Sequence, residues 1–211
     1  MNEGFVVYGA VGCGSAAVEA ALTLVGARFR IEDVPYKALA GGVNPMAQVP
    51  SLELPGGELM TESAAILIWL ADSYPAARLA PALDSPTRPA FLRWMAFVSS
   101  AIYSLYWLKD DPSRVAPDAE SQAFLKTHLG DRIAACWGIM EAGIDPGRYI
   151  LGDDLSVLDL YVTVVGRWTP REPLHQTIAP RIGEIIRRVE ADPRLEAIWA
   201  ERFPRLPGDD Q

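Results

Sequence analysis

The strand signals of this 211-residue chain are confined to its first 61 residues, and the chain from residue 90 onward has the spacing of helices. Four short segments of the first part favour strands, because they are rich in strand-forming residues or alternate in polarity: residues 5–8, 28–34, 48–54 and 59–61. Pro55-Gly56-Gly57-Glu58 joins the last two as a hairpin turn. The chain can therefore build one small sheet, which the later residues do not extend.

Helices complete this first part of the chain. Residues 16–25 predict a small, tightly packed helix that stops at Gly26, and the stretch through Gly41-Gly42 to Asn44-Pro45 holds at most a short helix. Ser63 is expected to cap an apolar helix over residues 64–71. The predicted order of elements is β-α-β-α-β-β-α.

The second part of the chain is predicted to be helical throughout. Residues 74–89 contain four prolines and little periodicity, which is typical of a linker between domains. Helical spacing then recurs in five segments: residues 91–108, 120–142, 157–168, 178–191 and 195–202. We therefore expect a domain over residues 1–74, a linker over residues 75–89 and an all-helical domain over residues 90–211.

Charge and cysteine usage narrow the classes of function. The formal charge of −8 argues against nucleic acid or an anionic membrane as the main partner. The two cysteines and the two histidines lie far apart in the sequence, so we expect neither a disulfide framework nor a bound metal. No apolar run could cross a bilayer, and the N-terminus has no basic segment before an apolar stretch. We expect a cytoplasmic protein.

The glycine-spaced loop after the first strand is open to two interpretations, and the first is a dinucleotide-binding site. Gly12-Cys-Gly14-Ser-Ala-Ala17 follows a strand and opens a helix, and Glu32 and Asp33 end the next strand. This pattern meets most of the dinucleotide-binding fingerprint. A dinucleotide-binding domain also needs further parallel strands with crossover helices, whereas this chain turns back in a hairpin at Gly57 and then becomes helical. The later sequence therefore disfavours a dinucleotide site.

Two dipeptides, one on each side of the hairpin, indicate a ligand other than a dinucleotide. Val49-Pro50 taken alone is a proline at the start of a strand, and Glu62-Ser63 taken alone is a helix cap preceded by an acid. Together they are more specific, because they occur in this order, one hairpin apart, after a β-α-β unit. The matching segments are residues 6–25, Asn44-Pro45-x-x-Gln48-Val49-Pro50, Leu59-x-Thr61-Glu62-Ser63-Ala-Ala-Ile66 and Ser156-Val-Leu-Asp159-Leu. Through them essentially the whole chain resembles a cytosolic glutathione S-transferase.

This resemblance implies a fold and a ligand. The fold is α+β, with an N-terminal thioredoxin-like domain built on a mixed sheet and an all-helical bundle after it. The bond before Pro50 is expected to be cis, with the main chain of Val49 facing the cysteinyl part of glutathione. Ser63, at a helix N-terminus, is expected to bind a carboxylate of glutathione, and Glu62 its γ-glutamyl ammonium. The resemblance also implies a homodimer.

Ser156-x-x-Asp159 is predicted to be a folding element of the second domain. It has the form of a capping box with aspartate in place of the usual glutamate, and Leu155 and Leu160 are placed as a hydrophobic staple. We assign it a structural role and no catalytic one.

Three residues qualify as the group that stabilises the thiolate of glutathione. We favour Cys13 in the loop, whose thiol pKa the helix start is expected to lower, then Ser15 as the expected N-cap, then Tyr8 at the end of the first strand. Each also has a plainer explanation: Cys13 as a small filler between glycines, Ser15 as a cap only, and Tyr8 as strand packing.

The electrophile is expected between the loop at Ala10-Val11 and the first helices of the second domain. Tyr103, Tyr106 and Trp107 share one helical face there, although such a stripe is also typical of a core or a subunit interface. Trp168 is open to the same two interpretations. These residues do not identify the electrophile.

Three functions follow from these expectations. The first is conjugation of the glutathione thiolate to small apolar electrophiles, a detoxification activity in which glutathione is the co-substrate. The second is glutathione-dependent thiol–disulfide exchange through Cys13 alone, since the chain has no Cys-x-x-Cys. The third is a protein that binds glutathione without catalysis.

Overall fold

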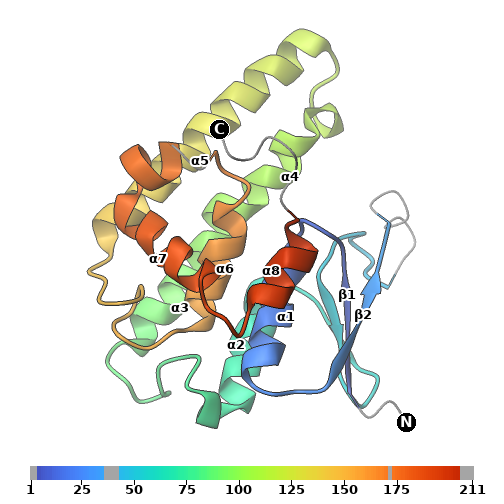
Figure 1. Ribbon diagram of the computed structural model, residues 1–211. Coiled ribbons are helices and arrows are strands. Elements are labelled where there is room, and N and C mark those ends of the chain that lie inside the picture. Colours follow the sequence, from blue (N-terminus) through green and yellow to red (C-terminus); the bar gives the residue numbers. More distant parts are fainter. Residues whose placement is uncertain (1–3, 36–42, 171–172, 205–211) are drawn as a thin grey trace.

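The computed structural model describes residues 4–35, 43–170 and 173–204. Its strands are β1 (Phe5–Gly9), β2 (Phe29–Asp33), β3 (Ser51–Glu53) and β4 (Leu59–Met60). They form one sheet in the order β2-β1-β3-β4, in which β1 is parallel to β2 and antiparallel to β3, and β3 is antiparallel to β4. The sheet lies at one side of the molecule, and helices fill the rest (Figure 1).

Helices α1 (Ser15–Leu24) and α2 (Ser63–Ser73) pack against each other beside this sheet (Figure 1). Val7 of β1 pairs with Leu52 of β3, and both side chains are fully buried in the core that the two helices share. Successive side chains of a strand leave opposite faces, so Tyr8 leaves the sheet on the face opposite Val7. The mixed sheet with these helices is the predicted thioredoxin-like arrangement.

The second predicted helix of the first domain lies partly outside the described residues. Its expected stretch includes residues 36–42, and residues 43–50, which are described, contain no helix. The other elements of the predicted order β-α-β-α-β-β-α are present, with ends within a few residues of the expected ones.

The prediction that Ser15 and Ser63 are N-caps is wrong. The N-caps of α1 and α2 are Gly14 and Glu62, and each serine is the first residue inside its helix. Both serines are buried, and their hydroxyl groups donate to other side chains, Ser15 to Glu19 and Ser63 to Tyr161. A buried hydroxyl needs a hydrogen-bond partner, and here that partner is another side chain rather than a backbone group of the helix end.

All five helical segments predicted after the linker are present. The first is split by a π-helical segment, Val98–Tyr103, which a single periodicity does not reveal. The helices are α3 (Arg88–Phe97), α4 (Ser104–Asp110), α5 (Ala119–Gly143), α6 (Val157–Gly166), α7 (Pro180–Glu190) and α8 (Glu196–Arg202). Shorter helical turns lie at Pro75–Ala77, Pro112–Arg114 and Pro173–Ile178.

Helix α6 is the centre of the helical domain, because every one of its residues is buried. A helix that is apolar on all sides has no face for water and needs neighbours all round. Those neighbours are α3 and α7 within the helical domain and α1 and α2 beside the sheet. Helix α8 also returns to pack on α1, which brings the end of α8 beside the loop between β1 and α1 (Figure 1).

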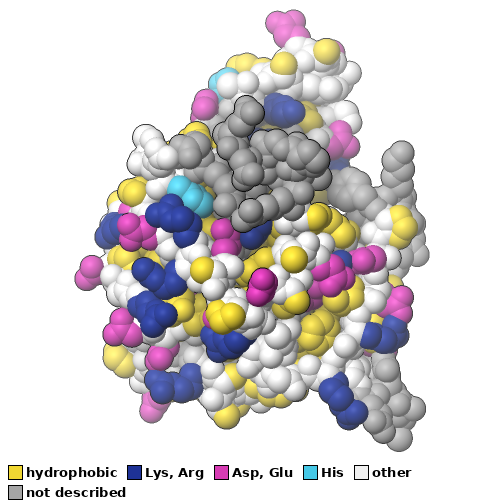
Figure 2. Space-filling model, viewed as in Figure 1, with side chains coloured by type: hydrophobic (Ala, Val, Ile, Leu, Met, Phe, Trp, Pro, Cys, Tyr) yellow, Lys and Arg dark blue, Asp and Glu magenta, His cyan; other side chains and the backbone are white. Residues whose placement is uncertain are grey.

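The outer surface carries charges of both signs. Figure 2 shows acidic and basic side chains interspersed over the viewed face, with apolar side chains between them. Helix α7 is built in this way, since Ile182, Ile186 and Val189 are buried while Arg187 and Arg188 stand in its last turn. Interspersed charge of this kind is typical of a surface that faces water.

The predicted capping box is present at the start of α6. Both the backbone N–H and the hydroxyl of Ser156 donate to Asp159 Oδ2, at 2.8 and 2.6 Å, and the N–H of Ile150 donates to Oδ1 at 2.9 Å. Leu155 and Leu160 are both buried in the core. Burial of the Asp159 carboxyl raises its pKa from 3.8 to about 6, against the hydrogen bonds from Ser156 and Ile150, which lower it. Asp159 therefore fastens the loop before α6 to the helix.

Replacing Asp159 by Ala should lower the free energy of unfolding by about 3 kcal/mol, because two buried N–H groups lose their acceptor. Urea denaturation measures the change. Asp154→Ala is the matched control, because Asp154 makes an exposed ion pair with Arg78 and such pairs contribute little. Equal stability of the Asp159 variant and the wild type would contradict the structural role.

The pKa of Asp159 also predicts a pH dependence. The folded state holds this proton more tightly than the unfolded chain, because the folded pKa is about 6 and the ordinary value is 3.8. The stability that this group contributes is therefore fully present below pH 3.8 and is lost as the pH rises through 6. The difference in unfolding free energy between the wild type and Asp159→Asn should favour the wild type more at pH 4 than at pH 7. A pH-independent difference would mean that the two states bind this proton equally.

Candidate functional site

The loop between β1 and α1, residues 10–14, is held by the helical domain, and we call it the thiol loop. Gly12 has φ = 76°, a conformation that a residue with a β-carbon rarely adopts. Its N–H donates to the carbonyl oxygen of Arg202 at 2.7 Å, and its own carbonyl accepts from Trp168 Nε1 at 2.8 Å. Arg202 ends α8 and Trp168 follows α6, so two distant parts of the chain fix the residue before Cys13.

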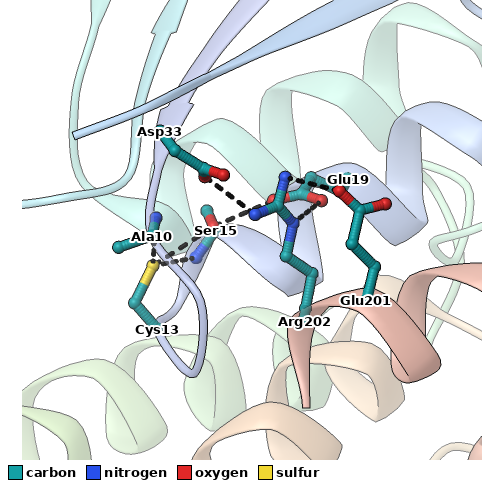
Figure 3. A network of polar contacts seen from close by, with 7 residues as sticks. All are labelled: Ala10, Cys13, Ser15, Glu19, Asp33, Glu201 and Arg202. Carbon is teal, nitrogen blue, oxygen red and sulfur yellow. Dashed lines mark hydrogen bonds and ion pairs between the residues drawn. The ribbon is translucent and has the colours of Figure 1, made fainter. Parts of the chain in front are cut away.

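Cys13 is half-buried at the start of α1 (Figure 3). Its Sγ accepts from the backbone N–H groups of Ala10 and Ser15, at 3.2 and 3.3 Å, and its S–H donates to Ser15 Oγ at 3.1 Å. Burial raises the pKa of the thiol, and the hydrogen bonds with the Ser15 side chain and with the two backbone donors lower it by less. The expectation that the helix start lowers this pKa is therefore wrong, because the loss of water around the thiolate outweighs the helix end.

Ser15 leads into a chain of buried charges (Figure 3). Its hydroxyl donates to Glu19 Oε1 at 2.9 Å, and Glu19 Oε2 accepts from Arg202 Nε at 2.7 Å. The side chains of Glu19 and Arg202 are only 2% and 1% exposed, and Arg202 also donates to the more exposed Asp33 at 2.7 Å. Burial raises the pKa of Glu19, opposed by Arg202.

Glu19 and Arg202 were not predicted from the sequence, and Asp33 was considered only as part of the dinucleotide pattern. One signal was available for Glu19. It is the single charged residue of α1, whose sequence Ser-Ala-Ala-Val-Glu-Ala-Ala-Leu-Thr-Leu is otherwise small or apolar. An acid in such a helix is either a solvated position or a paired buried one. Its partner lies 183 residues away and could not be read from spacing.

Tyr8 is not brought to this cluster. Its hydroxyl donates to Glu53 Oε2 at 2.9 Å, across the face of the sheet opposite Val7. The hydrogen bond to Glu53 raises the pKa of the Tyr8 phenol, with burial as a smaller cause. Of the three residues predicted to act on the thiol, the structure brings together Cys13 and Ser15.

Tyr103 reaches the start of α1 from the helical domain. Its hydroxyl lies so close to Gly14 that a β-carbon there would collide with it. Burial raises the pKa of this phenol, and the neighbouring Cys13 raises it further. Trp168 and Tyr161 stand beside the Tyr103 ring, with ring centres 4.7 and 6.0 Å away. Tyr103 therefore forms an aromatic wall next to Cys13.

The other two members of the predicted aromatic stripe lie elsewhere. Tyr106 is buried, and its hydroxyl contacts Thr169, which also accepts from Trp137 Nε1 at 3.1 Å. Trp107 is 45% exposed, and the guanidinium of Arg114 lies over its ring. The stripe is thus divided between the thiol loop, the core and the surface.

Glu62 and Ser63 lie near Tyr103 and Tyr161. Ser63 Oγ donates to the hydroxyl of Tyr161 at 3.0 Å, and burial raises the pKa of Tyr161 to about 12. The negative charge of Glu62 raises the pKa of both tyrosines, which places Glu62 near them. Glu62 itself is exposed and has φ = 67°, a strained conformation for a residue with a side chain. Tyr103 and Tyr161 therefore connect Cys13 with the Glu62-Ser63 pair.

The bond between Val49 and Pro50 is cis, as expected. The loop before it is ordered by Asn44, whose side-chain amide donates to the carbonyl of Gln48 at 3.0 Å and accepts from the N–H of Met46 at 2.9 Å. Val49 is half-buried and Pro50 is buried. The Asn44-Pro45-x-x-Gln48 pattern thus shapes the turn that presents Val49.

Among residues 4–35, 43–170 and 173–204, no cluster of three or more histidine, cysteine, aspartate or glutamate side chains could hold a metal ion. The helices within those same ranges are each too short or too polar to cross a membrane.

The chain matches the family model of the glutathione S-transferase N-terminal domain over residues 15–73. It is 30% identical over 199 residues to the uncharacterized GST-like protein YncG of Escherichia coli K12, covering 91% of this chain and 95% of that protein. It is 26% identical over 178 residues to glutathione S-transferase GstA of Escherichia coli O157:H7, covering 80% and 84%.

Solved structures give the same result. A glutathione transferase homologue from Sulfitobacter, with bound glutathione, superimposes with a TM-score of 0.83 at 26% identity, over 93% of this chain and 97% of that one. A sphingomonad glutathione S-transferase complexed with glutathione gives a TM-score of 0.76 at 26% identity, over 95% and 100%. The thioredoxin-like sheet, the helical domain packed on it and these similarities over nearly the full length place the chain in the glutathione S-transferase family.

Proposed function

We propose that the protein binds glutathione between Cys13 and the Glu62-Ser63 pair and transfers its thiolate to small apolar electrophiles. The observation that carries this proposal is the convergence of three groups around Tyr103 and Tyr161: a half-buried thiol, an exposed carboxylate on a residue of positive φ, and a buried serine. Relatives from Sulfitobacter and a sphingomonad have been solved with glutathione, which supports the same ligand here.

The proposed glutathione contacts are complementary in charge. Glu62 offers an exposed carboxylate to the γ-glutamyl ammonium. Ser63 and the first N–H groups of α2 suit a carboxylate, because a helix N-terminus has unpaired donors and a positive dipole end. The main chain of Val49, next to the cis bond, is proposed to pair with the cysteinyl part of the tripeptide.

Cys13 is the proposed donor to the glutathione sulfur. The other two candidates have their protons committed elsewhere, Ser15 to Glu19 and Tyr8 to Glu53. Because burial raises the pKa of Cys13, its thiol stays protonated at neutral pH and can donate an S–H hydrogen bond to a thiolate. A donor of this kind lowers the pKa of glutathione's own thiol and so raises the population of the nucleophile.

The electrophile is proposed to enter over Val11 and the aromatic wall. Val11 is 57% exposed in the thiol loop, and the ring of Tyr103 is stacked edge-on with Trp168 behind that loop. Apolar side chains around a nucleophile favour small apolar compounds and exclude water. The sulfur then attacks the electrophilic carbon, and the leaving group departs with the electron pair of the broken bond.

One observation favours a second function. Cys13 is a free, half-buried thiol, so it could form a mixed disulfide with glutathione and act as a monothiol oxidoreductase. The raised pKa of Cys13 disfavours this function, because the attacking species in disulfide exchange is the thiolate.

We also infer a cytoplasmic homodimer with domains over residues 1–74 and 90–211, joined by residues 75–89. The domain boundary is supported by the end of α2 at Ser73 and the start of α3 at Arg88. Asp72 and Arg88 form a bidentate ion pair across this linker, at 2.8 and 2.7 Å. Light scattering of the purified chain at twice the monomer mass would support the dimer.

Replacing Cys13 separates the two activities. Cys13→Ser keeps a hydrogen-bond donor and should retain most of the conjugation, whereas Cys13→Ala should lower kcat/KM by about 100-fold, as loss of one charge-stabilising donor does. Both variants should lose reduction of glutathione mixed disulfides. Steady-state assays with a chromogenic aryl halide and a mixed-disulfide substrate measure the two rates. Full conjugation by Cys13→Ala would contradict the role of this donor.

Changes at the Glu62-Ser63 pair test the binding site. Glu62→Gln and Ser63→Ala should each weaken glutathione binding by about tenfold, because each removes a charged or hydroxyl partner worth about 1.4 kcal/mol. Isothermal titration calorimetry measures the dissociation constant. Glu58→Gln removes the same charge from the exposed hairpin turn and should leave binding unchanged. No heat of binding to the wild type at millimolar glutathione would contradict the proposed function itself.

A further inference from the structure

The ion pair between Glu19 and Arg202 lies directly behind the thiol loop and is almost completely buried (Figure 3). Removing two charges from water costs several kcal/mol for each ion, and their attraction only partly offsets this cost. A pair of apolar side chains would fill the same space without that cost. The pair therefore calls for an explanation beyond stability, and its contacts with the thiol loop provide one.

Two hydrogen bonds link the thiol of Cys13 to the ion pair, and both donate toward Glu19: Cys13 donates to Ser15, and Ser15 donates to Glu19. A serine hydroxyl has one proton, and Ser15 donates it to the carboxylate of Glu19. The oxygen of Ser15 therefore offers only lone pairs to Cys13, and the thiol donates to it. Gly9 lies against the side chain of Ser15, and a β-carbon at position 9 would collide with the Ser15 hydroxyl. In this arrangement Cys13 holds its proton, and Ser15 cannot donate to the sulfur.

We propose that Glu19, held in place by Arg202, is a positioning residue that commits the Ser15 hydroxyl and so keeps Cys13 a protonated hydrogen-bond donor. This proposal rests on the proposed function, and it deepens that function by naming what separates conjugation from disulfide exchange. A protonated Cys13 donates to the sulfur of glutathione and attacks disulfides slowly.

The charges around the two groups agree with this role. Glu19 faces Arg202 from α8, and Arg202 also pairs with Asp33 of β2 and Glu201. Cys13 faces Tyr103 from the helical domain and the negative charge of Glu19, which raises its pKa in addition to burial. The contact with the Ser15 side chain lowers this pKa only where the hydroxyl donates to the sulfur, and here Ser15 donates to Glu19 instead. Arg202 holds the carboxylate with its side chain and the N–H of Gly12 with its carbonyl. One residue thus fixes both ends of the hydrogen-bond chain.

The decisive variant is Glu19→Gln, because it should reverse the chain. Arg202 can only donate, so the glutamine oxygen must face Arg202 and its NH2 group must face Ser15. Ser15 then accepts from glutamine and turns its own proton toward Cys13, where it stabilises the thiolate. The pH midpoint for alkylation of Cys13 should fall by about one pH unit, which raises the alkylation rate at pH 7 by about tenfold.

The measurement is the rate of iodoacetamide alkylation from pH 6 to 10 on the full chain without glutathione. Mass spectrometry of the peptides distinguishes Cys13 from the fully buried Cys136. Val18→Ala is the matched control, because Val18 is fully buried in the same helix and its truncation loosens α1 without changing a charge. An unchanged or raised midpoint in folded Glu19→Gln, or an equal fall in Val18→Ala, would overturn the proposal.

Ser15→Ala provides a second test that leaves the ion pair between Glu19 and Arg202 in place. If Ser15 only accepts from Cys13, its removal takes away an acceptor of the neutral thiol, and the midpoint should fall. If Ser15 donated to the thiolate, the midpoint would rise, and a rise would overturn the proposal. These assays contain neither glutathione nor electrophile. Their outcome is therefore separate from the calorimetric and kinetic tests of the proposed function.

Discussion

The burial of α6 between the sheet-side helices and the helical domain is the constraint on which the rest of the structure depends. Helix α6 contains Asp159, which fastens the preceding loop, and Tyr161, which accepts a hydrogen bond from Ser63 at the start of α2. Trp168, just beyond α6, donates to Gly12 in the thiol loop. The candidate site is therefore assembled between two domains. Neither the thioredoxin-like sheet nor the helical bundle contains it alone.

Much of the fold could be predicted from the sequence because its signals are local. The hairpin at Gly57, the end of α1 near Gly26 and the capping box at Ser156 and Asp159 each depend on a few neighbouring residues. The early end of the strand signals disfavoured a dinucleotide domain. The cis bond before Pro50 followed from a resemblance rather than from local chemistry, and it is present.

The parts that could not be predicted depend on partners distant in the sequence. Ser63 looks like a helix cap, yet its hydroxyl donates to Tyr161, 98 residues away in α6. The thiol pKa of Cys13 was expected to fall at a helix start, and burial raises it instead. Arg202 reads as an ordinary basic residue at the end of a helix, and only the fold brings it to Glu19. The aromatic stripe was divided by the π-helical segment and the core, which periodicity cannot show.

The anchoring of Gly12 by Trp168 and Arg202 has a consequence for how the protein is made. Trp168 follows Gly12 by 156 residues, and Arg202 follows Glu19 by 183. As the chain leaves the ribosome, the first strand and helix emerge long before these anchors exist. During that interval the carboxylate of Glu19 has no cation beside it, and the cysteine loop has no scaffold. The contacts that hold the thiol are therefore established only after Arg202 has been synthesised, so a chain that stops before residue 202 lacks them.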